Sequence, residues 1–186
     1  MDKYQMKLYL VNYRHIDSIP CKSITELPLE EAKKLAEQLH ADSSCRAHRR
    51  FGTDFERYYV DRCKAEQWMY DAFCKLGGTP RKKHPLYFSI QPSDVLSENY
   101  GEHCMIQIDL DEIDDGDISF TFGDSMALYY TEKLNQVFTK NDLFQQLKSY
   151  DNDVNKMLEQ NKEQAASIEA QLWNDKYLKD YFEGIK

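Results

Sequence analysis

Three short apolar runs in the middle of the chain predict the strands at the centre of a β-sheet. They are Leu86–Ile90, Cys104–Leu110 and Ile118–Phe122, and each is rich in aromatic or β-branched residues and bounded by turn residues. In the second run, Ile106 and Ile108 alternate with residues that suit the opposite face. Because successive side chains of a strand point to opposite faces, this alternation predicts a sheet with one apolar face.

Two further runs predict strands near the two ends of the chain. Lys7–Tyr13 alternates weakly between apolar and polar residues. Ser167–Trp173 reads SIEAQLW, with Ile168 and Ala170 on one face and Glu169 on the other. A late strand is therefore predicted to carry a carboxylate opposite its apolar side chains.

Two long helices are predicted between the first strand and the central ones. Thr25–His40 has Pro28 in its first turn, where proline is well tolerated, and apolar residues along one side. Thr53–Leu76 is the longest predicted element, and Thr53 and Glu56 have the spacing of a capping box. Its apolar face is expected to contain Phe55, Tyr59, Tyr70 and Phe73.

The remaining segments have weaker patterns. Ala41–Gly52 is polar and basic, which is typical of a loop. Ala127–Tyr150 is predicted to form two helical pieces, with a cap at Thr139. Asp151–Gln164 is predicted to be an exposed helix or a mobile connection, and Asn174 is expected to cap a last short helix.

Composition limits the class of protein. A chain of 186 residues is expected to form one domain, residues 1–186, and 13% aromatic residues argue against disorder. No apolar run is long enough for a membrane span, and the first residues do not resemble a signal peptide. The five cysteines form no CxxC pair, which favours free thiols and a cytoplasmic location.

Charge is unevenly distributed along the chain. The formal net charge is -8, which argues against non-specific binding to nucleic acid. Residues 46–84 nevertheless have an excess of basic side chains, whereas residues 85–186 are strongly acidic. The basic stretch indicates either a solvated surface or a site for an anionic ligand. Within it, Arg62 and Glu66 lie four residues apart on the long predicted helix, where we expect a surface ion pair.

Common catalytic and metal-binding signatures are missing from the sequence. It contains no Gly-rich phosphate loop, no HExxH and no nucleophile elbow. His103 and Cys104 are adjacent on a predicted strand and therefore point to opposite faces, which disfavours a shared metal ion. The acidic run Asp109–Asp117 lacks the residue order of a calcium loop. No metal site is predicted.

The order of the predicted pieces resembles a known family. A first strand, a basic loop, and the stretches HPLYFSI, ISFTFGDS and SIEAQLW follow one another. This order is similar to that of DNA-targeting ADP-ribosyltransferase toxins of the DarT type, within the ADP-ribosyltransferase superfamily. The resemblance runs loosely over most of the chain. It implies a single α/β or α+β domain with a mixed, bent sheet covered by helices.

The resemblance also implies a substrate and site residues. NAD would be the substrate, Glu169 the catalytic carboxylate, and Arg50 or its neighbour Arg49 the clamp on the diphosphate, with Arg46 as a further choice. The first strand would contribute Asn12 to the NAD pocket. The family usually has His and Thr where this sequence has Leu10 and Asn12. The resemblance leaves the acceptor and the oligomeric state open.

The chemistry of such a reaction suits these residue types. Cleavage between nicotinamide and ribose builds positive charge on the sugar, and a nearby carboxylate stabilises that charge. An arginine can bind a diphosphate through two parallel hydrogen bonds. The competing interpretation is a cytosolic binding or interaction protein without catalysis, of this fold or of an unrelated one.

Overall fold

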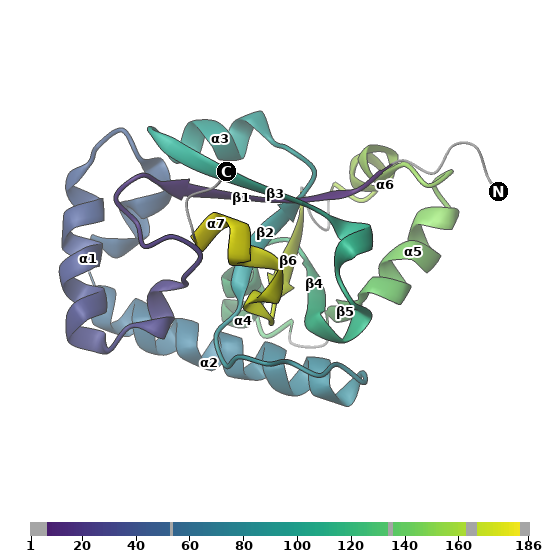
Figure 1. The fold of residues 1–186 in the computed structure, drawn as a ribbon, viewed down its shortest axis with the longest axis horizontal. Helices are drawn as coiled ribbons and strands as arrows, with labels where there is room; N and C mark the ends of the chain where they lie inside the picture. The colour runs from purple at the N-terminus through teal and green to yellow at the C-terminus, as the bar shows by residue number, and fades with distance from the viewer. Residues whose placement is uncertain (1–6, 53, 134–135, 163–166, 183–186) are drawn as a thin grey trace.

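A six-stranded antiparallel sheet runs through the centre of the protein in the order β3-β1-β2-β6-β4-β5 (Figure 1). The structure is a computed structural model that describes residues 7–52, 54–133, 136–162 and 167–182. Its strands are Tyr9–His15 (β1), Leu86–Ile90 (β2), His103–Asp109 (β3), Ile118–Phe122 (β4), Val137–Thr139 (β5) and Ile168–Leu172 (β6). The predicted strands are confirmed.

The prediction of a mixed sheet is wrong, because every pair of neighbouring strands is antiparallel. The connection from β1 to β2 contains two helices, Leu29–Ala41 (α1) and Phe55–Lys75 (α2). One crossover helix normally returns the chain to the end of the sheet where it started, which gives a parallel pair. Two successive helices allow the chain to enter β2 from the opposite end of the sheet, so β2 runs antiparallel to β1. A fully antiparallel sheet combined with helices is an α+β fold.

Within the described ranges, five shorter α-helices and five 3-10 helices complete the fold. The α-helices are Asp94–Asn99 (α3), Ser125–Tyr130 (α4), Lys140–Lys148 (α5), Val154–Gln160 (α6) and Lys179–Phe182 (α7). The 3-10 helices are Ile24–Glu26 (η1), Arg46–Phe51 (η2), Leu110–Glu112 (η3), Asp115–Asp117 (η4) and Asp175–Leu178 (η5). Figure 1 shows α2 crossing beneath the strands, with α1 at one end of the molecule and α5 and α6 at the other.

The main core lies on one face of the sheet. Leu10, Phe88, Phe120 and Ala170 are buried there, and the strand register places Phe88 and Phe120 on either side of Ala170. Helices α5 and α6 cover part of this face with Leu143, Leu147, Val154 and Met157. Each such side chain, when fully buried, contributes about 1.5–3 kcal/mol of hydrophobic free energy.

Helix α2 packs on the other face through its C-terminal half. Met69 and Phe73 are fully buried against Trp173, which follows β6, and the rings of Phe73 and Trp173 stack with centroids 6.3 Å apart. Phe55 is buried as predicted, but Tyr59 is only partly buried. Tyr70 is also only partly buried, so the predicted apolar face is right at Phe55 and Phe73 and less complete at the two tyrosines.

The long helix differs from its prediction at the N-terminus and in its middle. Asp54 is the N-cap, and its carboxylate accepts a hydrogen bond from the Arg57 amide at 3.2 Å. Thr53, the predicted cap, lies outside the described residues. The prediction of a surface pair is wrong, because the side chains of Arg62 and Glu66 are only 8% and 1% exposed and lie 3.3 Å apart.

Helical periodicity explains why this pair is buried. Alternating steps of four and three residues along α2 lead from Phe55 to five residues in turn. These are Tyr59, Arg62, Glu66, Met69 and Phe73. These positions form one stripe along an α-helix. The charged pair therefore sits in the middle of the face that α2 turns toward the protein.

Three predictions for the weaker segments need correction. The segment predicted as a loop at 41–52 contains the 3-10 helix η2. The segment predicted as two helical pieces does contain α4 and α5, but the strand β5 lies between them, and Phe138 of this strand stacks on Phe120 of the neighbouring strand at 5.7 Å. In the segment 151–164, α6 is anchored by the buried residues Val154 and Met157, and residues 163 and 164 lie outside the described residues.

The caps predicted at Thr139 and Asn174 and the free thiols are confirmed. Thr139 and Asp142 form a capping box at the start of α5, and the side chain of Asn174 accepts from the Lys176 amide at the start of η5. All five cysteines are unpaired. No helix within the described ranges has the length and apolar character needed to cross a bilayer.

Candidate active site

A pocket of about 460 Å³ lies between the sheet, η2 and α2. Three of the four residues predicted for the site, Asn12, Arg50 and Glu169, line it, and Arg46 lines it as well. Arg49 is exposed and is not among the lining residues. Leu10 is fully buried in the main core, so a side chain at that position does not reach the pocket.

The register of the sheet places Glu169 on the pocket side. Glu169 pairs with Ser89 of β2 and with Thr121 of β4. Its neighbours Ile168 and Ala170 are buried in the main core on the opposite face. The alternation in SIEAQLW therefore directs the carboxylate away from the core, as predicted from the sequence.

Polar side chains on the same face lead to the Glu169 carboxylate. The indole nitrogen of Trp173 donates to the Ser119 hydroxyl at 2.9 Å, and this hydroxyl donates to Oε1 of Gln171 at 2.9 Å. Nε2 of Gln171 then donates to Oε1 of Glu169 at 3.2 Å. Because all three donors point in the same direction along the chain of bonds, the last group in it must be an acceptor, as a carboxylate is.

Two opposing effects act on the charge of Glu169. Burial raises the pKa of Glu169 above its ordinary value, and the carboxylate of Asp124 raises it further. The guanidinium of Arg62 and the hydrogen bond from Ser125 lower it. The backbone amide of Ser125 donates to Oε1 of Glu169 at 3.3 Å.

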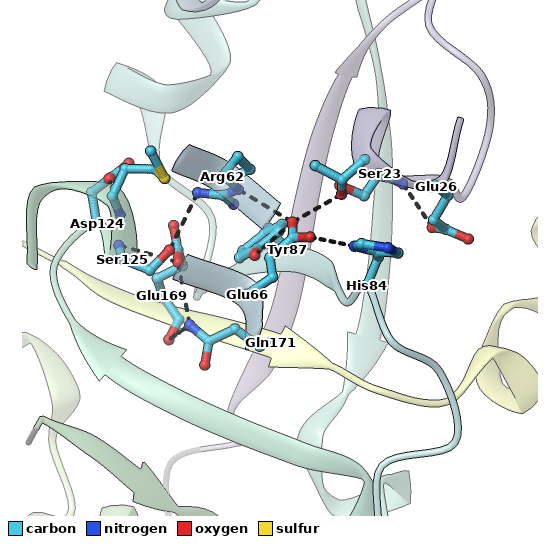
Figure 2. Close-up of polar contacts among 12 residues, drawn as sticks. Ser23, Glu26, Arg62, Glu66, His84, Tyr87, Asp124, Ser125, Glu169 and Gln171 are labelled. Carbon is cyan, nitrogen blue, oxygen red and sulfur yellow. Dashed lines mark hydrogen bonds and ion pairs between the residues drawn. The ribbon is translucent and has the colours of Figure 1, made fainter. Parts of the chain in front are cut away.

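Arg62 is a pocket residue that the sequence prediction did not identify. Its guanidinium lies 3.7 Å from the centre of the Tyr87 ring, and one nitrogen donates to the hydroxyl of Ser125 at 3.3 Å. Figure 2 shows it between the residues around Glu169 and those around Glu66. The sequence could have indicated this, because Arg62 falls in the same helical stripe as the apolar residues of α2. The four-residue spacing of Arg62 and Glu66 does not by itself distinguish a surface pair from a buried one.

Glu66 anchors Arg62 from beneath the pocket. Its fully buried carboxylate accepts hydrogen bonds from the hydroxyls of Thr25 and Tyr87, both at 3.0 Å, and lies 2.6 Å from Nδ1 of His84. With Arg62, these partners satisfy both carboxylate oxygens (Figure 2). Buried charges persist in proteins only with such partners, so the network fixes Arg62 in place.

The η2 side of the pocket combines cations with aromatic rings. The guanidinium of Arg50 lies 5.5 Å from the centre of the Phe51 ring and 5.9 Å from that of Tyr58. The cationic lining residues are Arg14, Lys22, Arg46, Arg50 and Arg62, and the carboxylates are Asp124 and Glu169. The pocket is therefore net positive in a chain whose net charge is -8. This field favours an anionic ligand.

Asn12 has a structural contact within the site. Its side-chain nitrogen donates to the main-chain oxygen of Tyr87 at 2.8 Å. Backbone pairing between β1 and β2 includes Leu10 with Ile90 and Val11 with Ser89. The Asn12 side chain thus continues the link between the two strands one residue further, at the wall of the pocket.

A histidine pair forms the wall near β1. His15 is buried and its Nε2 lies 2.8 Å from Oδ2 of Asp42, and the rings of His15 and His48 meet edge to face at 5.5 Å. Burial, with the charges of Arg50 and His15, lowers the pKa of His48 to about 4. His48 therefore supplies a neutral ring to this wall at neutral pH.

The described residues contain no group of three or more side chains arranged to hold a metal ion. The site combines two carboxylates, Asp124 and Glu169, with several arginines and aromatic rings, a set that suits an anionic organic molecule. No protein-family model, no curated protein and no solved structure matches this chain.

Proposed function

We propose that the protein binds NAD in this pocket and transfers the ADP-ribose group to a nucleophilic acceptor. The observation that supports this function best is that Glu169, Arg50 and the β1 strand line one cavity. The resemblance to ADP-ribosyltransferases implies these same three parts, which are widely separated in the sequence. The protein would then be an NAD-dependent transferase.

In this function Glu169 stabilises the positive charge that develops on the ribose. The bond between ribose and nicotinamide breaks, and its electron pair leaves with nicotinamide. The acceptor's nucleophilic atom forms the new bond to the same carbon and releases its proton to solvent. The fixed donors around Glu169 hold its carboxylate in one orientation, so little reorganisation is needed when the charge appears.

Arg50 would bind the diphosphate. A guanidinium matches phosphate oxygens with two parallel hydrogen bonds, and Arg50 is exposed within the pocket rather than held in an ion pair that the structure describes. The partly exposed ring of Tyr58 beside it offers a face on which a nucleotide base can stack, whereas Phe51 is buried and stacks on His48. Arg46 and Lys22 add positive charge along the same pocket.

A second candidate function is binding of an anionic nucleotide without catalysis. It is favoured by Leu10, which lies in the core at a position where the family usually has a histidine. It is also favoured by the hydrogen bond from Asn12 to Tyr87, which engages the side-chain nitrogen of Asn12 within the protein. The same basic pocket would then serve for recognition alone.

The test combines calorimetric titration with NAD and an assay for released nicotinamide. Heat of binding together with nicotinamide release supports the transferase. Binding without release, in the presence of mixed cellular macromolecules as acceptors, supports the binding protein. No heat with millimolar NAD would rule out the transferase. Arg57→Ala is the matched control for arginine substitutions, because that side chain is 73% exposed and lies on α2 outside the lining residues.

A further inference from the structure

The pair Arg62–Glu66 is more extensively bonded than a structural ion pair requires. Glu66 already accepts from Thr25 and Tyr87 and lies beside His84, so three partners other than Arg62 satisfy its carboxylate. Arg62 is 7% exposed, and removal of a guanidinium from water costs several kcal/mol unless its contacts repay that cost. The contacts of Arg62 away from Glu66 should therefore explain why a cation is buried here.

Those contacts lead to Glu169. Arg62 donates to the Ser125 hydroxyl at 3.3 Å, and the backbone amide of the same Ser125 donates to the Glu169 carboxylate at 3.3 Å. Arg62 also stacks on the Tyr87 ring, which keeps the plane of its guanidinium fixed. Figure 2 shows Arg62, Ser125 and Glu169 grouped together at one side of the network.

The charged and titratable groups around Glu169 come from three elements. Arg62 lies on α2, Asp124 is the N-cap of α4, and Tyr87 lies on β2. Gln171 and Ser125 are neutral donors. Asp124 repels a second negative charge, so Arg62 is the group whose charge favours an ionised carboxylate at this position.

We propose that Arg62 is a positioning residue that keeps the Glu169 carboxylate ionised and oriented in the pocket. A buried carboxylate next to Asp124 would otherwise take up a proton more readily and lose the charge that stabilises the ribose cation. The catalytic meaning of this proposal rests on the proposed transferase function. The effect of Arg62 on Glu169 does not, and it can be measured without NAD.

The primary experiment follows the side-chain carboxyl of Glu169 by 13C NMR during a pH titration. The titrating signal that is missing from the spectrum of Glu169→Gln is assigned to Glu169. The comparison is between Glu66→Gln, which keeps Arg62, and the double variant Arg62→Met with Glu66→Gln, which removes both charges of the pair. Glu66→Gln leaves Arg62 without its carboxylate partner and should lose stability, whereas the double variant leaves no lone buried charge. Circular dichroism therefore checks that both variants are folded before their titrations are compared.

We expect the titration midpoint of Glu169 to lie clearly higher in the double variant than in Glu66→Gln. Arg62→Lys, added to the wild-type chain, should keep a midpoint close to that of the wild type because it keeps the charge. Equal midpoints in Glu66→Gln and in the double variant would overturn the proposal, because Arg62 would then only hold α2 to the sheet.

An activity measurement connects this result to the reaction. If nicotinamide is released, the acid limb of the pH–rate profile should shift to higher pH in the double variant relative to Glu66→Gln. The change in KM should be smaller than the change in kcat. If the wild type releases none, the proposed function fails, and the NMR comparison still decides the role of Arg62. A large rise in KM with unchanged kcat would show instead that Arg62 binds substrate, which would also overturn the proposal.

Discussion

The carboxylate of Glu66 lies 2.6 Å from Nδ1 of His84, and this contact joins the middle of α2 to the segment that leads into β2. Both groups belong to the network that also contains Arg62 and Tyr87. The contact connects the basic segment before β2 to the floor of the pocket. Stability and site geometry are therefore coupled at this point.

We predict that Glu66→Ala lowers the free energy of unfolding by about 3–5 kcal/mol, because it leaves Arg62 as an uncompensated buried cation. Urea unfolding measures the change. The matched control is Glu56→Ala on the same helix. Glu56 forms an exposed ion pair with Lys33, so its loss should cost less than about 1 kcal/mol. Equal effects of the two substitutions would show that the Arg62–Glu66 pair is solvated.

A second prediction concerns the packing of α2 on the sheet. Phe73→Ala should cost about 3–5 kcal/mol in urea unfolding, because Phe73 is fully buried against Trp173. Leu76→Ala is the control, since Leu76 is 48% exposed at the end of the same helix and should change stability by less than about 1 kcal/mol. A loss below about 1 kcal/mol for Phe73→Ala would contradict the packing of this face.

A third prediction separates the roles of Glu169 and Arg50. Glu169→Gln should lower turnover of NAD by about 10²–10³ with little change in NAD affinity, because the lost charge acts mainly when the bond breaks. Arg50→Ala should weaken NAD binding and cause a smaller loss at saturating NAD. Calorimetry beside a turnover assay measures both. The controls are Glu159→Gln, an exposed carboxylate on α6, and Arg57→Ala. The same kinetic pattern in both site variants would contradict the assigned roles.

A fourth prediction is a pH dependence of stability that arises from His48. The pKa of His48 is about 4 in the folded protein, below the ordinary histidine value of 6.5. Between these values the unfolded chain binds a proton at His48 and the folded protein does not. The free energy of unfolding should therefore fall as pH decreases from 6.5 to 4, by up to about 3 kcal/mol from this residue.

His48→Phe tests this prediction, because phenylalanine keeps a ring that can stack on Phe51 and cannot take up a proton. Urea unfolding of both proteins across this pH range should show a shallower loss in the variant. Hydrogen bonds from Ser44 and His15 lower the pKa of Asp42 to about 2, and this carboxylate is present in both proteins, so its contribution cancels in the comparison. Parallel pH curves for the two proteins would contradict a buried, neutral His48.

Local patterns were sufficient to predict elements whose character is set by neighbouring residues. The bounds of β2 and β4 match the apolar runs Leu86–Ile90 and Ile118–Phe122, and alternation in the last strand assigned Glu169 to the face opposite Ala170. The caps at Thr139 and Asn174 followed from their hydrogen-bonding side chains. Strand alternation and capping act over a few residues, so sequence alone contains that information.

Tertiary structure decided which strands are neighbours and which charges are buried. The sequence did not indicate that all neighbouring strands are antiparallel, because strand direction depends on how a connection crosses the molecule. It did not distinguish Arg50 from Arg49, because the backbone conformation of η2 decides that Arg50, and not Arg49, lines the pocket. Arg62 and Glu66 had the spacing of a surface pair, and they are buried because α2 turns that face toward the protein, where their partners come from β2, η1 and α4. Burial depends on what covers a face, and that is a property of the whole fold.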